Sequence, residues 1–240
     1  MQKDYEKYYH KLEKYDWWFL GRQDLIKKLV MKYSSEGEFI LDLGCSGGKA
    51  IEKLKQRKVY GLDISFDAVL KARKAGLKNI INGDAQNIPI KDGTFDLVVC
   101  SDLLEHIKKD KQTVNEIHRV LKKGGIALIF VPAFKFLWGQ HDIVNQHLRR
   151  YSKRGFVKLL GKKFIIRRLF FWNFFLFFPL FLFKFVRRFK PGNPVSDQFL
   201  KVPKLINSFF LSILGIENKL VGRGINFPFG VSLIAVLEKR

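Results

Sequence analysis

The chain of 240 residues has a formal net charge of +22, and 47% of its residues are apolar and 15% aromatic. This composition excludes a disordered chain, and the length allows one sizeable core rather than two full domains. The charge is uneven, because residues 151–240 hold 17 Lys and Arg against 3 acids while residues 1–150 hold 27 against 19. Such an excess favours a polyanionic partner, either nucleic acid or an anionic membrane face.

Cysteine usage and the N-terminal sequence bear on the compartment. The spacing of Cys45 and Cys100 makes neither a disulfide framework nor a metal site, which favours a reducing compartment. The alternative is that the two thiols approach each other near a ligand. The first thirty residues lack the apolar core of a secretory signal. We therefore expect a cytoplasmic protein.

The first half of the chain alternates between helical and extended patterns. Helical periodicity predicts one or two helices between Glu6 and Met31, with a break near Trp17. Five short apolar segments then alternate with helical segments, and they are FILDLG, KVYGLDI, NIINGD, FDLVVCSD and IALIFVP. This alternation predicts a doubly wound α/β fold with a parallel sheet covered on both faces. Gly124 and Gly125 are expected to stop the preceding helix at about Lys123.

The pattern changes after Pro132. An irregular polar and aromatic segment leads to a helix around SKRGFVKLLGK, and strands are predicted at FIIRRLFF and at GVSLIAVLEK. Between these strands lie two apolar helical stretches, NFFLFFPLFLFKFVRRF and VPKLINSFFLSILGIENKLV, joined by the linker KPGNPVSD. The sequence therefore predicts a hydrophobic helical insertion between the last two strands.

The first predicted strand runs into a glycine turn of the form D-x-G-x-x-G-G. A strand, a glycine turn and a helix bring backbone N–H groups and the positive helix end up to a ligand. Asp42 precedes the first glycine, Gly44, and an acid there repels pyrophosphate but suits a ligand with an ammonium and a sulfonium group. This indicates S-adenosylmethionine. A nicotinamide dinucleotide is the alternative, disfavoured because the third glycine of G-x-G-x-x-G is misplaced.

Two further acids follow predicted strands. Asp63 ends the second strand, where a carboxylate can accept both hydroxyls of a ribose. Asp84, followed by Ala85, ends the third strand, where a carboxylate can accept the exocyclic amine of an adenine that lies on Ile64. This spacing fits any adenosine ligand.

Four segments in order resemble the class I S-adenosylmethionine-dependent methyltransferases, in particular the small-molecule and quinone-type group. They are FILDLGCSGG, VYGLDIS, INGDAQNIPIKDGTFDLVVCSDLLEHI and EIHRVLKKGGIALIFVP, and together they cover residues 39–132. The resemblance implies a Rossmann-like sheet of seven strands in the order 3-2-1-4-5-7-6, with only the last strand antiparallel. It also implies S-adenosyl-L-methionine as the cofactor and no requirement for a metal.

The resemblance further implies which residues contact the cofactor. Arg22 falls where related quinone methyltransferases have a cofactor-contacting arginine before the first strand, and Ser101 ends the fourth strand. Ser46 stands where the family has a second glycine, which places a Cβ close to the cofactor. The expected cofactor-binding residues are Arg22, Asp42, Gly44, Cys45, Ser46, Gly47, Asp63, Ile64, Asp84, Ala85 and Ser101.

The segment after the fifth strand is the candidate acceptor site, because open α/β sheets hold ligands at this edge. Histidines beside an acid, together with an arginine pair, suit an acidic or phosphate-bearing acceptor with a hydroxyl to deprotonate. We expect His141, His147 and His106 as candidate catalytic bases, and Arg149, Arg150 and Tyr151 as substrate-binding residues. The alternative is that these are bracing or surface residues. Trp17, Trp18 and Phe19 either close over the cofactor or anchor the first helix.

The insertion carries the strongest apolar run. Leu169 to Phe183 is apolar except for Asn173, and basic residues lie on both sides of it. The run is too short to span a bilayer once the sixth strand is subtracted, so we expect no crossing. Phe and Leu between basic ends suit a helix in the headgroup region of an anionic leaflet, at the same edge as the active site. A lid or a dimer interface is the alternative.

We therefore expect a single domain over residues 1–240, made of a helical cap (1–35), a cofactor-binding core (36–132), a substrate-facing segment (133–163) and the insertion (174–228). The expected function is methyl transfer to a lipophilic or lipid-linked small molecule at the inner face of the cell membrane. The alternatives are a nucleic-acid methyltransferase, favoured by the charge, and a non-catalytic cofactor-binding partner. Against the nucleic-acid alternative, the fourth strand is followed by Ser101-Asp102-Leu103-Leu104 rather than an Asn/Asp-Pro-Pro-aromatic motif.

Overall fold

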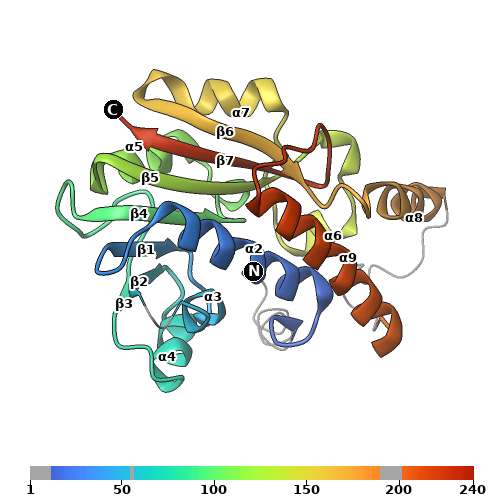
Figure 1. Cartoon of the computed structure of the whole chain (residues 1–240), viewed down its shortest axis with the longest axis horizontal. Coiled ribbons are helices and arrows are strands. Elements are labelled where there is room, and N and C mark those ends of the chain that lie inside the picture. The colour runs from blue at the N-terminus through green and yellow to red at the C-terminus, as the bar shows by residue number, and fades with distance from the viewer. Residues whose placement is uncertain (1–11, 55–56, 190–201) are drawn as a thin grey trace.

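A computed structural model describes residues 12–54, 57–189 and 202–240, although the side chains of 183, 184 and 186–189 are outside the description. Within these ranges the centre of the molecule is a seven-stranded sheet of order β3-β2-β1-β4-β5-β7-β6 (Figure 1). The strands are β1 Phe39–Leu43, β2 Lys58–Asp63, β3 Ile80–Asn82, β4 Phe95–Ser101, β5 Leu121–Pro132, β6 Phe164–Trp172 and β7 Ser232–Lys239. β7 runs antiparallel to both of its neighbours, and the other pairings are parallel. The predicted order and strand directions are confirmed.

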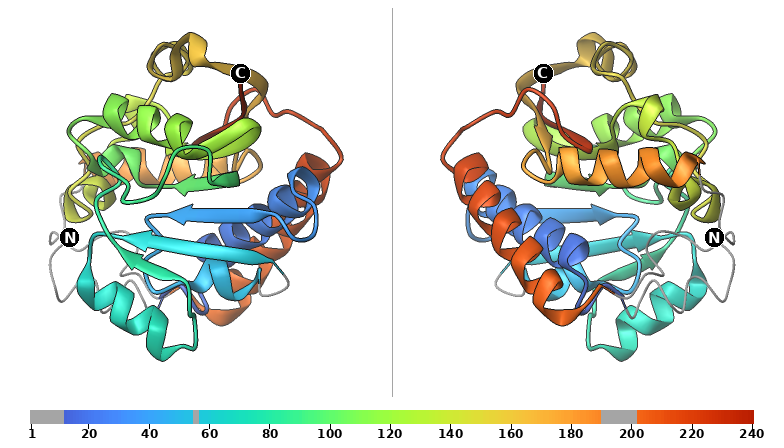
Figure 2. Two further views of the ribbon diagram at one scale, coloured as in Figure 1. Left: turned by 90° about the vertical axis from the view of Figure 1, so that its left-hand side faces the viewer. Right: turned by 90° about the vertical axis from the view of Figure 1, so that its right-hand side faces the viewer.

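The central strands are buried on both faces, which explains their nearly continuous apolar sequences. Successive side chains of a strand point to opposite faces. In β4, Val98 and Cys100 therefore join one apolar cluster while Leu97 and Val99 join the other. Each cluster is closed by helices, so the sheet is the middle of three layers (Figure 2).

The helices divide between the two faces. On one face, α2 Trp17–Tyr33, α3 Lys49–Glu52, α4 Phe66–Lys74 and α9 Lys204–Gly222 contribute buried apolar side chains. On the other face, α5 Asp110–Val120 and α7 Lys153–Leu160 do so. The remaining helical elements are η1 Leu104–His106, η2 Lys135–Leu137, α6 Gln140–Val144, η3 Gly161–Lys163 and α8 Phe177–Phe189.

Three predicted boundaries differ from the structure. α5 ends at Val120 rather than at Lys123, because Leu121 is already extended and pairs with Phe95. Gly124 instead lies within β5 at φ +75°, where the β4–β5 register shifts, so its left-handed conformation serves a bulge. The third strand is shorter than predicted, and α3 is a single turn.

The predicted break near Trp17 is the start of α2. The Asp16 side chain accepts a hydrogen bond from Trp18 N at 2.9 Å and caps the helix. The helix predicted from Glu6 lies mostly outside the described residues.

The insertion is anchored to the first helix. α8 and α9 both lie between β6 and β7, and α9 runs beside α2 (Figures 1 and 2). The buried Asn218 of α9 donates to Gly21 O at 2.8 Å and accepts from Trp172 Nε1 at 2.8 Å. Glu217 accepts from Phe174 N at 3.0 Å, which fixes the chain as it leaves β6.

The opposite face of α9 is apolar and exposed. Leu205 is 83% exposed and Phe209 is 62% exposed. Among the described residues, α9 is the one helix that is long enough and apolar enough, judged by length and composition alone, to cross a membrane. Of its most apolar 18-residue stretch, 22% is buried.

Candidate active site

A cavity of about 920 Å³ opens at the carboxyl ends of β1, β2 and β4. This is the edge at which parallel α/β sheets bind ligands. Of the predicted cofactor residues, those that line it are Arg22, Asp42, Gly44, Cys45, Ser46, Asp63, Ile64 and Ser101. Among the described residues, Gly47, Asp84 and Ala85 are not in its wall. The cavity thus brings together residues from the ends of three strands and from α2.

The glycine turn is held tightly against β2. Gly44 N and Cys45 N both donate to Leu62 O, at 2.8 and 3.2 Å. Gly44 has φ +79°, and a Cβ added there would lie 3.1 Å from the Leu103 side chain. Ser46 also adopts a positive φ, of 50°. Glycine at position 44 is therefore required both by its conformation and by the close approach of Leu103.

Asp63 joins the two turns that follow β1 and β2. Its Oδ2 accepts from Ser46 N at 2.8 Å and its Oδ1 accepts from Ser65 N at 2.9 Å. These two bonds orient the carboxylate at the cavity wall. This geometry is compatible with the predicted ribose contact.

Asp42 lies deep in the cavity wall and is 6% exposed. Burial, with smaller contributions from Asp63 and Glu13, raises the pKa of Asp42 to about 7. A cationic ligand would favour the ionised carboxylate, because an opposite charge nearby stabilises the charged form.

Arg22 connects α2 to the ends of β4 and β7. Its guanidinium donates to Asp102 Oδ2 at 2.6 Å and to Ser232 Oγ at 2.7 Å, and lies 4.5 Å from the ring centre of Trp172. Asp102 accepts this bond from a left-handed backbone conformation, at φ +51°. Arg22 therefore lies in the cavity wall, where Asp102 and Ser232 of the same chain accept hydrogen bonds from its guanidinium group.

The acceptor side of the cavity is organised around Asp142, which is fully buried. Its Oδ1 lies 2.8 Å from His147 Nδ1 and accepts from Arg150 Nε at 2.8 Å. Its Oδ2 accepts from Gly139 N at 2.8 Å. The carboxylate therefore fixes the His147 ring and the Arg150 side chain at once.

The three predicted histidines converge. The His147 ring centre lies 4.7 Å from that of His106 and 5.4 Å from that of His141, and all three line the cavity. Burial and the neighbouring His147 lower the pKa of His106 to about 4. His106 is therefore a neutral imidazole at neutral pH.

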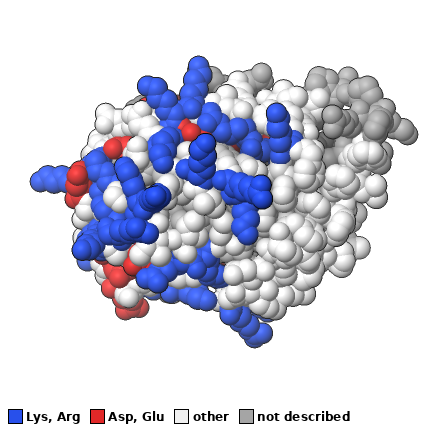
Figure 3. Space-filling view, turned by 90° about the horizontal axis from the view of Figure 1, so that it is seen from above, with Lys and Arg blue, Asp and Glu red and all other residues white. Residues whose placement is uncertain are grey.

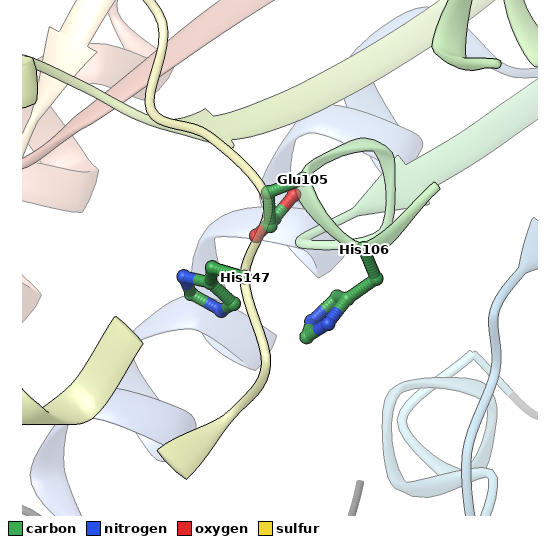
Figure 4. A group of neighbouring side chains, drawn as sticks. All are labelled: Glu105, His106 and His147. Atoms are coloured by element: carbon green, nitrogen blue, oxygen red, sulfur yellow. The ribbon is translucent and has the colours of Figure 1, made fainter. Parts of the chain in front are cut away.

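Glu105 lies beside these histidines, although it was not among the predicted site residues. Figure 4 shows its side chain next to His106 and His147, with the carboxyl group to one side of both rings. Burial, followed by the charge of Asp102, raises the pKa of Glu105 well above its usual range. The sequence marks this position only by its place beside His106 after the fourth strand, and the approach of His147 from another segment has no sequence signal.

Arg149, Arg150 and Tyr151 do not act together. Arg150 lines the cavity, but Arg149 Nη1 and Tyr151 Oη both donate to Asp110 Oδ2, at 2.7 and 3.0 Å. Neither of these two is among the described lining residues. Their geometry fits the bracing alternative, since they tie the start of α5 to the chain after β5.

The cysteines are two buried free thiols. Burial raises the pKa of both Cys45 and Cys100, so both are protonated at neutral pH. This fits small apolar core residues. Trp17, Trp18 and Phe19 line the cavity from α2, and the rings of Trp18 and Trp172 make an edge contact.

The insertion supplies an apolar wall. Described residues in α8 and α9, and just before each of these helices, line the cavity. They are Leu176, Pro179, Leu180, Val202, Pro203, Ile206 and Phe210. One side of the cavity is therefore polar and formed by the sheet edge, and the other is apolar and formed by the insertion.

A protein-family model described as a methyltransferase domain matches residues 41–129, which span β1 to β5. Residues 41–129 therefore belong to this methyltransferase-domain family. The sheet order, the glycine turn and the acids after β1 and β2 are the features that the chain shares with class I S-adenosylmethionine-dependent methyltransferases, and the cofactor of that family is S-adenosylmethionine.

The two relatives described here match only part of this chain. The chain is 30% identical over 128 residues to a 2-phytyl-1,4-naphtoquinone methyltransferase of Nostoc punctiforme, covering 48% of this chain and 56% of that protein. It is 25% identical over 169 residues to a ubiquinone biosynthesis O-methyltransferase of Escherichia coli O157:H7, covering 63% and 64%. The chain thus spans less than two thirds of the length of either relative.

A solved structure, of an S-adenosylmethionine-dependent methyltransferase from Thermotoga maritima, superposes over the full length of both chains with a TM-score of 0.62 at 19% identity. At this identity the likeness shows the fold alone. It extends the class I methyltransferase fold beyond the matched domain to β6 and β7.

Proposed function

We propose that this class I methyltransferase transfers the methyl group of S-adenosylmethionine to a lipophilic small-molecule acceptor. The observation that carries the proposal is the cavity itself, in which the family's cofactor edge faces the apolar wall of the insertion. Two relatives named for quinone methylation support an acceptor of this class.

The chain offers partners for each part of the cofactor. The buried carboxylate of Asp42 would attract the ammonium and sulfonium charges, and Asp63 would accept the ribose hydroxyls. Asp84 Oδ1 accepts from Gln86 N at 2.8 Å, in a turn beyond the cavity wall, and the adenine would extend toward it over Ile64. When bound, S-adenosylmethionine supplies an electrophilic methyl group on sulfur.

The acceptor side supplies positioning and a base. The carboxylate of Asp142 orients His147, so the imidazole can take a proton from an acceptor hydroxyl without first reorganising. Apolar residues of α8 and α9 would exclude water and hold a hydrocarbon portion. In this scheme Arg150 positions the segment, because its Nε donates to Asp142 and its Nη1 donates to Ala133 O.

We further propose that the acceptor enters from a membrane surface. The exposed apolar side chains of α8 and α9 lie beside the residues that line the cavity, and Phe178 is 64% exposed. The arrangement suits an interfacial helix pair. Basic residues Lys184, Arg187 and Arg188, which were expected to contact lipid headgroups, have side chains outside the description.

Incubation with isotope-labelled methyl donor and a total cell extract tests the proposed activity. Partition into organic, aqueous and nucleic-acid fractions should place the label in the organic fraction. Asp63→Asn keeps the shape of the side chain but weakens its acceptor capacity, so this variant should lose most of the transfer. Label confined to nucleic acid would contradict the acceptor class, and no label in any fraction would favour a non-catalytic partner.

The second candidate, a nucleic-acid methyltransferase, is favoured by one observation. Exposed basic residues gather on α7, η3 and β6, and they are Lys153, Arg154, Lys158, Lys162, Lys163 and Arg167. Figure 3 shows basic residues crowded over part of this side of the molecule. Because the apolar wall rather than this basic face lines the cavity, the lipophilic acceptor is the better supported candidate.

A further inference from the structure

Glu105, His106 and His147 form a cluster that the methyl-transfer scheme leaves partly unexplained. One ligand atom of each side chain lies within 4.8 Å of those of the other two. Two of the residues come from η1, and the third comes from the segment after α6 (Figure 4). Leu148 N donates to Glu105 O at 2.7 Å, and this backbone bond holds the two segments face to face.

The Glu105 carboxyl group is the second observation. It is 1% exposed, and its Oε2 has no hydrogen-bond partner within the described part of the chain. A buried polar atom without a partner costs about 1–3 kcal/mol, and more when it is charged. Such an atom, in a carboxyl group with an oxygen within 4.8 Å of a ring nitrogen of each of two histidines, indicates that a ligand completes the site.

The nearby cations do not fill this role. Arg22 is paired with Asp102 at 2.6 Å, and Arg150 is paired with Asp142 at 2.8 Å. Each guanidinium is therefore already balanced by its own carboxylate. Glu105 is left as the acid of the acceptor side without a described ion-pair partner.

The environment of His147 matches that of a metal-binding histidine. Its Nδ1 lies 2.8 Å from the buried Asp142 carboxylate, which fixes the ring and leaves Nε2 as the atom available to a ligand. Histidines that ligate metals commonly donate their other ring N–H to a carboxylate in this way. Asp142 is in turn held by Gly139 N and Arg150, so the support is rigid.

We propose that Glu105, His106 and His147 bind a divalent transition-metal ion at the acceptor side of the cavity. Two imidazoles and one carboxylate suit Zn²⁺ or Mn²⁺ better than Mg²⁺, which prefers an all-oxygen shell. Bonds of about 2.0–2.2 Å require ligand atoms roughly 3–3.5 Å apart, so the side chains must close by about 1 Å. All three residues line the cavity, so the remaining coordination positions would take water or an acceptor oxygen. With the ion bound, His147 Nε2 would be a ligand and no longer a base, and the ion would instead lower the pKa of an acceptor hydroxyl bound to it.

This inference departs from the expectation from the sequence that no metal is required, and it does not depend on the proposed activity. Metal binding can be measured without methyl donor or acceptor. A protein that binds the ion but methylates nothing, and a protein that methylates without the ion, are therefore separate outcomes.

The test uses the full chain without a polyhistidine tag, stripped with a chelator and dialysed. Addition of Mn²⁺, followed by the loss of its free electron paramagnetic resonance signal, should reveal one binding site, and calorimetry should reveal one site for Zn²⁺. Glu105→Gln preserves the shape of the side chain and should weaken the affinity at least tenfold. Mg²⁺ should bind more weakly than Mn²⁺.

Two further variants keep the test decisive. His106→Gln should weaken binding to a similar degree, and it stands in for Glu105→Gln if circular dichroism shows that the latter is unfolded. His118→Gln is the matched control, because His118 lies on α5 and packs against Phe164. It should bind as the wild type does. Absence of a stoichiometric site in the wild type, or affinity unchanged in both cluster variants, overturns the proposal.

Discussion

At the scale of single residues, the site depends on three buried acids. Asp42 and Glu105 line the cavity and Asp142 lies behind His147 and Arg150, and the surroundings of the three acids differ. Asp142 has a histidine and an arginine as partners, whereas the environment of Asp42 is dominated by burial and by other acids. Burial without a counter-charge raises the free energy of the ionised carboxylate, and a cationic ligand would lower it.

This difference yields a prediction for Asp42→Asn. The pKa of Asp42 in the folded state, about 7, lies above the value near 3.9 of an unfolded chain. The group's stabilising contribution is therefore complete below about pH 4 and is lost as the pH rises through 7. Because Asn carries no charge, the variant should be more stable than wild type at pH 8, by up to about 4 kcal/mol.

Thermal melts of both proteins at pH 5 and pH 8 check this, since the stability gap should widen toward pH 8. The same variant should bind S-adenosylmethionine at least fivefold more weakly, as calorimetry would show. A variant that is less stable than wild type at pH 8 would mean that the carboxylate is stabilised where it lies. Asp67→Asn, on α4 outside the cavity, is a control for the loss of one acid.

Much of the cofactor side could be predicted at this scale, because Asp42, Gly44 and Asp63 occupy fixed places relative to predicted strand ends. The acceptor side could be predicted only as a group of residues. Which histidine meets Asp142, and that Glu105 lies beside two imidazole rings, depends on how η1 and the chain after α6 pack. Aspartate tolerates a positive φ, but nothing in the sequence around Asp102 shows that this residue adopts one.

At the scale of elements, the insertion is the part of the fold whose packing the sequence predicted least well. Its two apolar helices were predicted, but their docking was not, because an apolar run has no preferred face until a partner selects one. The partner is α2, and the selecting residues are polar. Asn218 bonds Gly21 O and Trp172 Nε1, and an added Cβ at Gly21 would lie 2.5 Å from the Leu214 side chain. Close approach of the two helices and one buried amide together set the docking.

Asn218→Ala should therefore destabilise the protein. The substitution leaves the Trp172 N–H buried and unpaired and removes the second hydrogen bond to the Gly21 carbonyl, at a cost of about 1–3 kcal/mol. Urea unfolding followed by tryptophan fluorescence would measure it. Ser212→Ala on the same helix removes only a bond to Ser208 O on the exposed side and should change stability by less than about 0.5 kcal/mol. Equal stability of the two variants would mean that α9 is not held by this amide.

At the scale of the whole molecule, a group of basic residues and an apolar surface lie on different elements of the described chain. The basic residues of α7, η3 and β6 gather near the sheet edge, whereas the described side chains of α8 and α9 beside the cavity are apolar (Figures 1 and 3). The net charge alone could not distinguish nucleic acid from membrane. The sequence predicted that the insertion lies at the edge of the active site, but which of its side chains line the cavity and which are exposed depends on how α8 and α9 pack.

The proposed membrane contact predicts that the protein sediments with anionic phospholipid vesicles. The double variant Leu205→Asn with Phe209→Asn removes two exposed apolar side chains of α9 and should reduce the bound fraction at least fivefold, because burial of each is worth about 1.5–3 kcal/mol at most. Val157→Asn, an exposed apolar position on α7, should bind as wild type does. Equal recovery in the supernatant with and without vesicles would exclude the contact.

The bond between Arg22 and Ser232 has a consequence for biosynthesis. These residues lie 210 positions apart in the sequence, and both border the cavity. While the ribosome is still making the intervening chain, the early strands can pair, but the pocket has no floor on the β7 side. Until then Arg22 lacks its Ser232 partner, and the unfinished sheet must keep its β5 edge uncovered until its last partner emerges.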